Sequence, residues 1–328
     1  MADYLTLAEY SQLKVDGGDL LTSGIIDTLI KAGGMFIEKM PIKTTGKLTA
    51  KGNRILNLPA AQNRQLNARY THAVGHSEKL EETVFMYGGR VDLDYLLDGS
   101  GEDMIEDPEA YQLRLHIMAQ TYQLKYDIFN NTPAANANGL IGLRYRLAND
   151  LPSAQRIDVG GLDISDDGGG TDDAAFMQKM RHLLYALPDH TADILAMNDT
   201  TLLAFRRVLE NLKLLKTTED QFGREILRWG EGGPYLVDMG YKADQTTKII
   251  TDEEDATGIS ADAGGTTTFT SIFGVRFGPE YLTGWEKQGM TTWRWQEGPI
   301  KSVEFDWPLG LFITDPHSVA QAHNIQAA

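Results

Sequence analysis

The sequence predicts an α+β protein, and three observations support this class. From Glu109 to Phe129 the chain runs without glycine or proline and repeats apolar residues at helical spacing, which predicts one long helix. Residues 234–250 and 266–278 are enriched in β-branched residues, which is typical of strands. Helical and strand segments follow one another without the regular alternation of a parallel βαβ sheet, so α+β is favoured over α/β.

Length and composition describe an ordinary globular protein. The chain has 328 residues, enough for about two domains, and is 42% hydrophobic and 23% charged. It has no cysteine, which excludes disulfides, thiolate nucleophiles and cysteine metal sites. No apolar run approaches the length of about 18 residues that a membrane helix needs, and the first residues carry acid where a signal peptide carries base. We therefore expect a soluble protein with no membrane partner.

Charge is distributed unevenly along the chain. The formal net charge of -16 argues against a protein that wraps nucleic-acid phosphates. Residues 39–79 nevertheless hold eight lysines and arginines against the single acid Glu78, whereas residues 91–109 hold eight acids and no base. A basic segment on an acidic body predicts contact between copies of the chain, or contact with another acidic partner.

The N-terminal segment, residues 1–38, predicts an arm. Apolar residues before residue 20 are too sparse for a core. Ser23 is a candidate N-cap, and Gly33 a candidate end, for a short amphipathic helix. Because so short a helix is marginal alone in water, we expect it to dock on the body of its own chain or of a neighbour. Its apolar side consists of Ile25, Ile26, Leu29 and Ile30.

Residues 39–79 predict an extended loop. Apolar residues are few, Gly46, Gly52, Pro59 and Gly75 interrupt the segment, and short β-like pieces such as 53–58 lie between them. A loop of roughly 40 residues without a core of its own is usually functional or ordered by a partner. A mobile loop of solvated lysines is an equally good interpretation of these residues.

Residues 80–135 predict a unit built on the long helix. A strand at 91–95 alternates apolar residues with acids, and Asp107 and Pro108 suit the N-cap and first turn of the helix. The helix carries two apolar stripes, so we expect it to be covered on more than one side. One stripe is Tyr111, Leu115, Met118, Tyr122 and Phe129, and the other is Leu113, Ile117, Leu124 and Ile128.

The rest of the chain mixes both kinds of element. Helices are predicted at 174–187 and 201–215, and a solvated acidic turn at 252–255. The last residues predict a pair of strands around Pro308. A short helix is expected to follow, with Asp315 as its N-cap and Pro316 at its first position.

No motif forms a convincing active site. Residues 163–168 match the first half of an EF-hand loop, but Ala174 stands where a bidentate glutamate is needed. His72 and His76 lack the glutamate and the helix of a zinc-protease site. No sequence matches a phosphate-binding glycine loop or a GxSxG nucleophile motif. We therefore predict no catalytic, cofactor-binding or metal-binding residue.

The order of these segments resembles that of tailed-bacteriophage major capsid proteins of the Hong Kong 97 type. SGIIDTLIKAGGMFIEKMP is similar to the family's N-terminal arm, and the basic segment ending in ARYTHAVG to its extended loop. ETVFMYGGRVDLDYLL resembles the strand that enters the peripheral domain, the long helix resembles the spine helix, and GLIGLRYRL resembles the turn into the axial domain. LAMNDTTLLAFRRVLE, PYLVDMGYKAD, TSIFGVRFG and VEFDWPLGLFITDPHSV complete a series that spans nearly the whole chain.

This resemblance implies a phage major capsid fold in four parts. They are an N-terminal arm at 1–38, an extended β-hairpin loop at 39–79, a peripheral domain with the spine helix at 80–135, completed by about 280–307, and an axial domain at 136–279 and 308–328. The implied role is structural and not enzymatic: self-assembly as hexamers and pentamers into the icosahedral head that encloses double-stranded DNA. The implied partners are further copies of the chain, a separate scaffolding protein, a portal and a decoration protein. The implied location is the virion, assembled in the host cytoplasm.

In such a shell the extended loop reaches over the adjacent subunit's peripheral domain. The basic loop of one copy would then lie against the acidic region of the next. We expect bases of the loop to dock on acids of the neighbour, each exposed pair contributing under about 1 kcal/mol but repeated many times. An acidic inner wall would also keep packaged DNA from adhering. The bases are Lys47, Lys51, Arg54, Arg64 and Arg69, and the acids are Asp92, Asp94, Asp98, Glu102, Asp103 and Glu106.

Three other interpretations stay open. An encapsulin-like compartment shell would share the fold and carry protein cargo instead of DNA. A metal-dependent acidic hydrolase would use Asp163, Asp166 or Asp167, and a small-ligand binding protein is less favoured because the basic loop suits assembly better than a pocket.

Some members of the capsid family link neighbours through a loop lysine, for which Lys47 and Lys51 are candidates. No matching asparagine is identified, so no cross-link is assigned.

Overall fold

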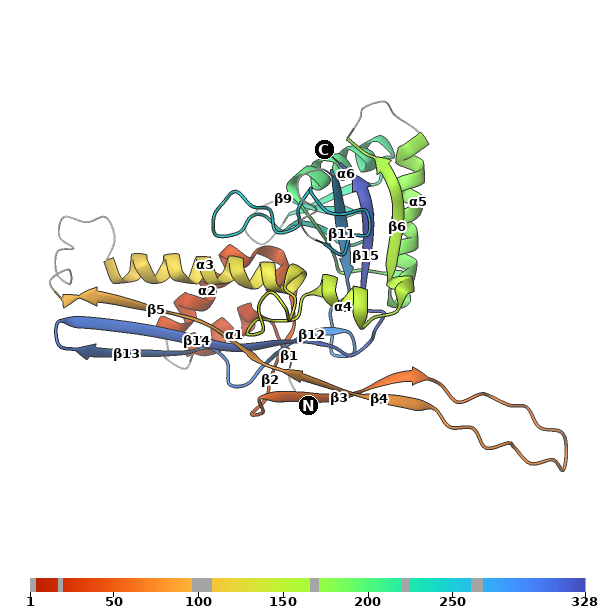
Figure 1. The fold of residues 1–328 in the computed structure, drawn as a ribbon, viewed down its shortest axis with the longest axis horizontal. Helices are drawn as coiled ribbons and strands as arrows, with labels where there is room; N and C mark the ends of the chain where they lie inside the picture. The colour runs from red at the N-terminus through yellow and green to blue at the C-terminus, as the bar shows by residue number, and fades with distance from the viewer. Residues whose placement is uncertain are drawn as a thin grey trace.

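Two lobes, each built on one sheet, make up the body of the protein, and a long hairpin leaves the body below their junction (Figure 1). The computed structural model describes residues 4–16, 20–95, 108–165, 171–219, 225–260 and 268–327. The six-stranded lobe has the strand order β1 (Tyr4–Leu5), β2 (Ile42–Thr44), β12 (Leu282–Glu286), β14 (Ile300–Ile313) and β13 (Thr291–Glu297), with β5 (Phe85–Asp94) also paired to β14. The seven-stranded lobe has the order β6 (Arg156–Asp163), β15 (Val319–Gln326), β11 (Phe269–Val275), β7 (Ile194–Met197), β10 (Tyr235–Asp238), β9 (Glu225–Trp229) and β8 (Leu215–Glu219).

Helix α3 (Pro108–Asn130) confirms the predicted long helix and lies along one face of the six-stranded sheet (Figure 1). Its stripe of Leu113, Ile117, Leu124 and Ile128 is buried in the main core cluster. The other stripe behaves differently, since Phe129 is buried but Tyr111 is exposed. The prediction that the helix is covered on more than one side is therefore wrong for its N-terminal half within a single copy.

Helix α2 (Leu20–Lys39) is longer than predicted and packs beside α1 (Leu7–Asp16) and α3. Ser23 is not its N-cap: it lies inside the helix, where its hydroxyl is 3.1 Å from that of Ser11. The helix does not end at Gly33, although Gly34 adopts φ 68° and kinks it. Helical structure resumes because Phe36 and the residue after it are fully buried, and tertiary packing outweighs the local preference of glycine.

Strand β14 is one continuous strand, so the predicted pair of strands around Pro308 is wrong. On one side β14 pairs with β5 along Ile300–Leu309. On its other side it pairs with β13 up to Asp306 and with β12 from Leu309 onward. Pro308 lies where one neighbour has ended and the next begins, a place where its missing N–H costs no ladder hydrogen bond.

The seven-stranded sheet is buried on both faces. In β7 the residues alternate, so that Ile194 and Ala196 face the core shared with α3 while Leu195 and Met197 face a second core under the helices. The helices of this second core are α5 (Thr171–Ala186) and α6 (Asp199–Asn211), which confirm the two predicted helices except at the end of the second, where Leu215 begins β8. The shorter elements α4 (Leu143–Asn149), η3 (Ser153–Gln155) and η4 (Pro188–His190) connect the lobes and sheet edges.

The C-terminal segment is a strand, so the predicted helix capped by Asp315 is wrong. Strand β15 lies between β6 and β11, and its Val319 faces one core while Ala320 and Ala322 face the other. Small apolar residues at alternate positions suit a central strand covered on both sides. Asp315 closes the turn before the strand, because its carbonyl accepts the backbone N–H of Ser318 at 3.1 Å.

The predicted strand at 266–278 is confirmed by β11, whereas that at 234–250 is confirmed only over β10. Residues 239–260, which we call the strap, form an irregular segment that passes over the junction of the lobes. The predicted solvated turn at 252–255 is wrong for Glu254, whose side chain is 0% exposed. None of the helices in the described ranges is both long enough and apolar enough to span a membrane.

Candidate functional site

Most of the predicted extended loop is a hairpin that reaches beyond the body of the molecule. Strand β3 (Thr49–Asn57) pairs antiparallel with β4 (His76–Thr83), which confirms the predicted hairpin. Every residue from 58 to 75 is exposed. The hairpin and the joined ends of β13 and β14 point to opposite ends of the molecule (Figure 1). A neighbouring copy can therefore be reached at either end.

The root of the hairpin is fixed on the body. Gly52 lies against the ring of Phe312, where a Cβ atom would come within 2.6 Å of the ring, so a side chain at this position cannot fit without moving the ring. Arg54 is only 8% exposed, and its Nη2 donates to the carbonyl of Ile313 at 3.4 Å. Phe312 lies on the face of the six-stranded sheet that points away from α3. The hairpin therefore covers one end of that face.

Three of the five predicted docking bases have partners within their own chain. Lys51 pairs with Glu81 across the hairpin at 2.7 Å, and Arg54 is buried as described above. Arg64 donates to the carbonyl of Ala68 at 3.2 Å, with its guanidinium 5.6 Å from the ring of Tyr70. The side chains of Lys47 and Arg69 are exposed.

The tip of the hairpin is also apolar, which sequence reasoning missed. Leu66 is 91% exposed and Leu58 77% exposed, and Tyr70 and Val74 are exposed as well. Exposed apolar side chains gathered at the end of a projecting segment are typical of a surface that is covered in an assembly. The signal was present in the sequence as isolated apolar residues within the basic segment.

The predicted acidic region is described only in part. The carboxylate of Asp92 on β5 accepts hydrogen bonds from Ser302 at 2.6 Å and Arg90 at 2.7 Å. These two contacts, the bond from Ser302 first, lower the pKa of Asp92. Asp94, at the end of β5, is exposed. Asp98, Glu102, Asp103 and Glu106 lie outside the described residues.

The far end of the six-stranded sheet has an open face that sequence reasoning did not identify. Val303 and Phe305 of β14 point to the core, so the residues between them point to the other side. Glu304 lies there beside Trp293 of the edge strand β13. We call the side chains on this side the open face: Met86, Arg90, Asp92, Trp293, Trp295, Ile300, Glu304 and Asp306.

Aromatic and charged groups are mixed on the open face. Trp293 is 48% exposed and Trp295 36% exposed, and the Arg90 guanidinium lies 5.0 Å from the ring of Trp295. Asp92, Glu304 and Asp306 add three acids to this single arginine. Two tryptophans separated by one residue in TTWRWQE are the sequence signal for this face, since both must lie on the same side of a strand.

The arm is folded onto the body of its own chain. Ile25, Ile26 and Leu29 are buried in the main core, and Ile30 is partly buried against it. Phe36 of the same helix is 5.2 Å from the ring of Phe129 on α3. The predicted apolar side of the arm therefore contacts its own chain.

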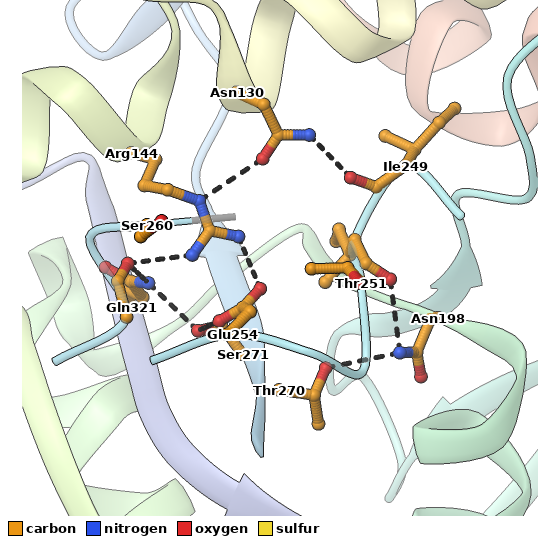
Figure 2. A network of polar contacts seen from close by, with 12 residues as sticks. Asn130, Arg144, Asn198, Ile249, Thr251, Glu254, Ser260, Thr270, Ser271 and Gln321 are labelled. Atoms are coloured by element: carbon orange, nitrogen blue, oxygen red, sulfur yellow. Dashed lines mark hydrogen bonds and ion pairs between the residues drawn. The ribbon is translucent and has the colours of Figure 1, made fainter. Parts of the chain in front are cut away.

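A buried polar network joins the two lobes (Figure 2). The guanidinium of Arg144 on α4 forms an ion pair with Glu254 of the strap, and its Nη1 donates to the carbonyl of Gly258 at 2.8 Å. Its Nε donates to Asn130 at the end of α3, whose amide in turn donates to the carbonyl of Ile249 at 2.5 Å. Burial raises the pKa of the Glu254 carboxyl, and Arg144 opposes this rise.

The strap is held largely through its backbone. Side chains from surrounding elements donate to six of its carbonyls, including those of Met239, Ile250 and Ala256. At Met239 the donor is Lys125 of α3, at 3.0 Å. Burial lowers the pKa of Lys125 to about 8, with the nearby Asp238 opposing this fall. The end of α3 and the strap thus form one polar junction.

The candidate metal-binding residues are not gathered into one site in the described part of the chain. Groups of three or more histidine, cysteine, aspartate or glutamate side chains that could hold a metal ion do not occur among the described residues. Asp163 of the EF-hand-like segment accepts hydrogen bonds from the backbone and hydroxyl of Ser165, at 2.8 and 2.6 Å. Asp166 and Asp167 lie outside the described residues. His72 and His76 are both exposed, and His76 begins β4.

Comparison with solved structures identifies the fold. The chain is similar to the SrpI encapsulin of Synechococcus elongatus PCC 7942, with a TM-score of 0.59 and 13% identity over 89% of this chain and 88% of that one. It is similar to the capsid protein of a native GTA particle, with a TM-score of 0.57 and 12% identity over 88% of each chain. For the capsid of the Myoviridae phage XM1 the TM-score is 0.53, with 11% identity over 85% of this chain and 86% of that one.

Sequence comparison alone does not reach these proteins. No protein-family profile matches the chain, and no curated protein matches it by sequence. The likeness lies in the arrangement of its elements: a bent arm, a projecting hairpin, a long helix along one sheet, and a second sheet between helices and strap. This is the Hong Kong 97-type major capsid fold, which the order of sequence segments predicted.

Proposed function

We propose, starting from this capsid fold, that the chain is the major capsid protein of a tailed bacteriophage. It self-assembles as hexamers and pentamers into the icosahedral head that encloses double-stranded DNA. Its role is structural, its site is the virion, and its partners are further copies, a separate scaffolding protein, a portal and a decoration protein. The observation that carries the proposal is the capsid fold itself, with an exposed hairpin tip at one end and the exposed open face at the other.

The two surfaces are complementary in chemistry. The tip offers exposed apolar side chains with Arg64 and Arg69 among them, and Lys47 is exposed at the root of the hairpin, just before β3. The open face offers two tryptophans with an excess of acids. Apolar contact at the centre and opposite charges around it are the usual composition of a specific interface. In one copy these surfaces lie at opposite ends, so they can meet only between copies (Figure 1).

The placement of the two surfaces permits a closed ring. Each chain's own hairpin already covers one end of the sheet face whose other end is the open face. A neighbour's tip laid on the open face would therefore extend this covering. Because tip and open face are different surfaces, the contact is head-to-tail, and such contacts close into rings when the rotation between copies closes. Hexamers and pentamers are rings of this kind.

The predicted docking is refined by the placement of its bases. Lys51 and Arg54 have partners on their own chain, so the neighbour's open face is contacted mainly by Arg64 and Arg69 at the tip. Lys47 lies before β3 and could meet a neighbour only near the root of the hairpin. On the acceptor side Asp92 belongs to the open face, and Asp94 lies at its border. Contact by Asp98, Glu102, Asp103 and Glu106 remains a proposal from the sequence.

An encapsulin-like compartment shell is the second candidate, favoured by the likeness to the SrpI encapsulin over most of both chains. The two candidates differ in content. We expect particles made with their natural partners to protect double-stranded DNA from nuclease. Closed shells that retain a protein cargo and no protected DNA would instead support the compartment.

Electron microscopy of negatively stained purified protein tests assembly itself. We expect closed shells or ring-shaped oligomers. A chain that stays a compact monomer at every concentration, with its hairpin packed on its own body, would contradict both candidates.

A further inference from the structure

Strand β13 is an edge strand, and in the described part of the chain it has a neighbouring strand on one side only, which is β14. Residues 293–297 are all exposed, whereas Thr291 and Thr292 are half-buried. The hydroxyl of Thr292 lies 3.2 Å from that of Thr22 on α2, so the start of the strand is near this helix. The outer backbone groups of an edge strand are a template for pairing with another chain. The accessible part of this edge is therefore residues 293–297.

The other edge strands of the two large sheets carry features that discourage such pairing. Strand β1 has only two residues, and β8 has five and includes the exposed Lys216. The ladder of β6 is interrupted near Gly160 and Gly161, which adopt φ 85° and 71°. Strand β5 has Gly88 and Gly89 at its centre, and charged residues alternate along the rest of it. Short length, lysine and glycine or a bulge are usual protections of an edge.

Strand β13 differs from these edges in length and composition. Its seven residues, TTWRWQE, include no glycine, proline or lysine, and they pair with β14 without a shift of register. Threonine and tryptophan favour strands. Arg294 points to the core side, where it forms an ion pair with Glu109 at 2.7 Å. A long, regular edge of this kind indicates that another strand pairs with it in the assembled protein.

We propose that β13 pairs antiparallel with β13 of a second copy across a two-fold axis, which joins two six-stranded sheets edge to edge. Antiparallel pairing of identical strands about an axis perpendicular to the sheet centres on one residue, and opposite residues lie on the same face. Trp295 is the middle of the accessible edge, so pairing of residues 293–297 places Trp295 opposite itself. Trp293 then lies opposite Glu297, and Arg294 lies opposite Gln296.

The charges favour the same register. Because side chains alternate between the two faces, the pairing can shift only by two residues at a time without exchanging the faces. A shift toward the start of the strand places Arg294 opposite Arg294 of the second copy, and like charges directly opposite each other are destabilising. A shift the other way leaves only residues 295–297 paired, because Gly298, at φ 61°, begins the turn to β14. Geometry and charge thus agree on Trp295 as the centre.

This contact differs from that between the hairpin tip and the open face. The hairpin contact is head-to-tail and closes a ring, whereas a two-fold contact can join chains of two different rings. The end of the molecule that carries β13 lies opposite the hairpin (Figure 1). Edge pairing uses backbone groups, so the tryptophan side chains stay available to a neighbour's hairpin tip. The pairing itself is inferred from the edge alone, and its role in joining rings rests on the proposed function.

The absence of cysteine allows the register to be tested by disulfide formation. Full-length chains with Arg294→Cys are mixed with tagged full-length chains carrying Gln296→Cys, and both retain the two tryptophans. The mixture is assembled, or concentrated where no shells form, and treated with oxidised glutathione. Directly opposite Cα atoms lie about 4.5–5.5 Å apart, which suits a disulfide, whereas diagonal neighbours lie about 7–8 Å apart. We expect the mixed dimer to exceed each like-with-like dimer about ten-fold or more.

Hydrogen exchange of the unsubstituted chain gives a second measurement. The backbone amides of residues 293–297 should exchange at least about ten-fold more slowly in the assembled than in the unassembled protein. Thr217→Cys is the matched control for the disulfide experiment, because Thr217 is exposed on the edge strand β8, which we expect to stay unpaired. This variant should give no linked dimer.

Three results would overturn the proposal. The first is equal yields of the three possible dimers, or an excess of a like-with-like dimer. The second is no linked dimer at all, even where the β13 amides are slow in shells, which would show that another strand covers the edge. The third is slow exchange of these amides in the unassembled chain, which would show that the chain covers its own edge. Failure of shells to form counts only against the proposed function, because concentrated protein still gives the dimer yields.

Discussion

Arg146 on α4 and Glu82 on β4 hold the root of the hairpin to the body through two parallel contacts, including Nη2 to Oε2 at 3.0 Å. Both side chains are mostly buried, and the Nε of Arg146 donates to the carbonyl of Ile141 at 3.0 Å. The direction of the hairpin is therefore set by a rigid, two-pronged ion pair. In a head-to-tail assembly that direction decides where the tip meets its neighbour.

Arg146→Gln should loosen this root. Removing one partner of a mostly buried pair leaves the Glu82 charge without compensation, so we expect a loss of about 3 kcal/mol in the free energy of unfolding. Backbone amides of β4 should also exchange hydrogen faster. Lys51→Gln is the matched control, because it breaks the exposed Lys51–Glu81 pair of the same hairpin and should cost under about 1 kcal/mol. Equal losses of unfolding free energy in both variants would show that the Arg146–Glu82 pair stabilises the hairpin no more than an exposed pair does.

The buried pair of Arg144 and Glu254 should give a strongly non-additive double-mutant cycle. Arg144→Met leaves a carboxylate buried without a cation and should cost about 3–5 kcal/mol. Adding Glu254→Leu removes the stranded charge, so the double variant should be more stable than Arg144→Met alone. Urea unfolding, followed by tryptophan fluorescence, measures the free energy of unfolding of each variant. If the two losses simply add, the pair does not act as a unit.

Lys125→Met should change stability in a pH-dependent way. The pKa of Lys125 is about 8 in the folded chain and 10.5 in the reference state, so the folded state binds this proton less tightly. The cost of burying the cation is present in full below pH 8 and disappears as the pH rises to 10.5, a change of roughly 3 kcal/mol. The gain in free energy of unfolding of the methionine variant over the original chain should therefore be largest near pH 7. If the difference in free energy of unfolding between the two chains stays constant from pH 7 to 10, the pKa of Lys125 is not lowered.

Reversing Lys47, Arg64 and Arg69 to glutamate should impair assembly while leaving the body folded. The three side chains lie on or near the projecting hairpin, so thermal unfolding should change little, whereas particle yield should fall and the remaining assembly should depend less on salt. The control reverses Arg181, Lys213 and Lys216, which are exposed on the seven-stranded lobe. Normal particles from the hairpin variant, or equal damage from the control, would contradict the docking.

Trp293→Ser combined with Trp295→Ser tests the open face. Both side chains are partly exposed on an edge strand, so the monomer should keep its fold, as circular dichroism can check. Shell formation should be lost because apolar anchors commonly dominate interfaces. Tyr185→Ser on α5 is the control, because it removes another exposed aromatic side chain, 67% exposed, from the other lobe. Assembly that survives the tryptophan changes would place the neighbour's hairpin elsewhere.

Local signals sufficed for the long helix and for the extended loop. Helix α3 begins at Pro108, where the first turn tolerates proline, and its interior contains only residues that permit helix. An extended loop was predicted because β-like pieces lay in a segment too poor in apolar residues to fold on itself. That this loop is a β-hairpin was implied only by the resemblance to the capsid family.

Other features depend on contacts between distant segments and were missed or mispredicted. The residues of β15 were assigned to a helix because Asp315 and Pro316 suit a helix start, yet insertion between β6 and β11 decides their structure. Glu254 was expected in water because three acids surround it, but its cation comes from Arg144, over a hundred residues away. The open face requires knowing that β13, β14 and β5 are neighbours.

The strap is attached to the lobes through its main-chain oxygens, which every amino acid supplies. Its outward side chains, such as Asp244, Glu253 and Thr257, can diverge in evolution without weakening those attachments. Two residues are exceptions: Gly258, where φ 63° and the nearby His323 leave no room for a Cβ atom, and Glu254, whose buried side chain pairs with Arg144. Substitutions along the outward side of the strap should therefore change the surface of the protein while leaving the angle between its lobes unchanged.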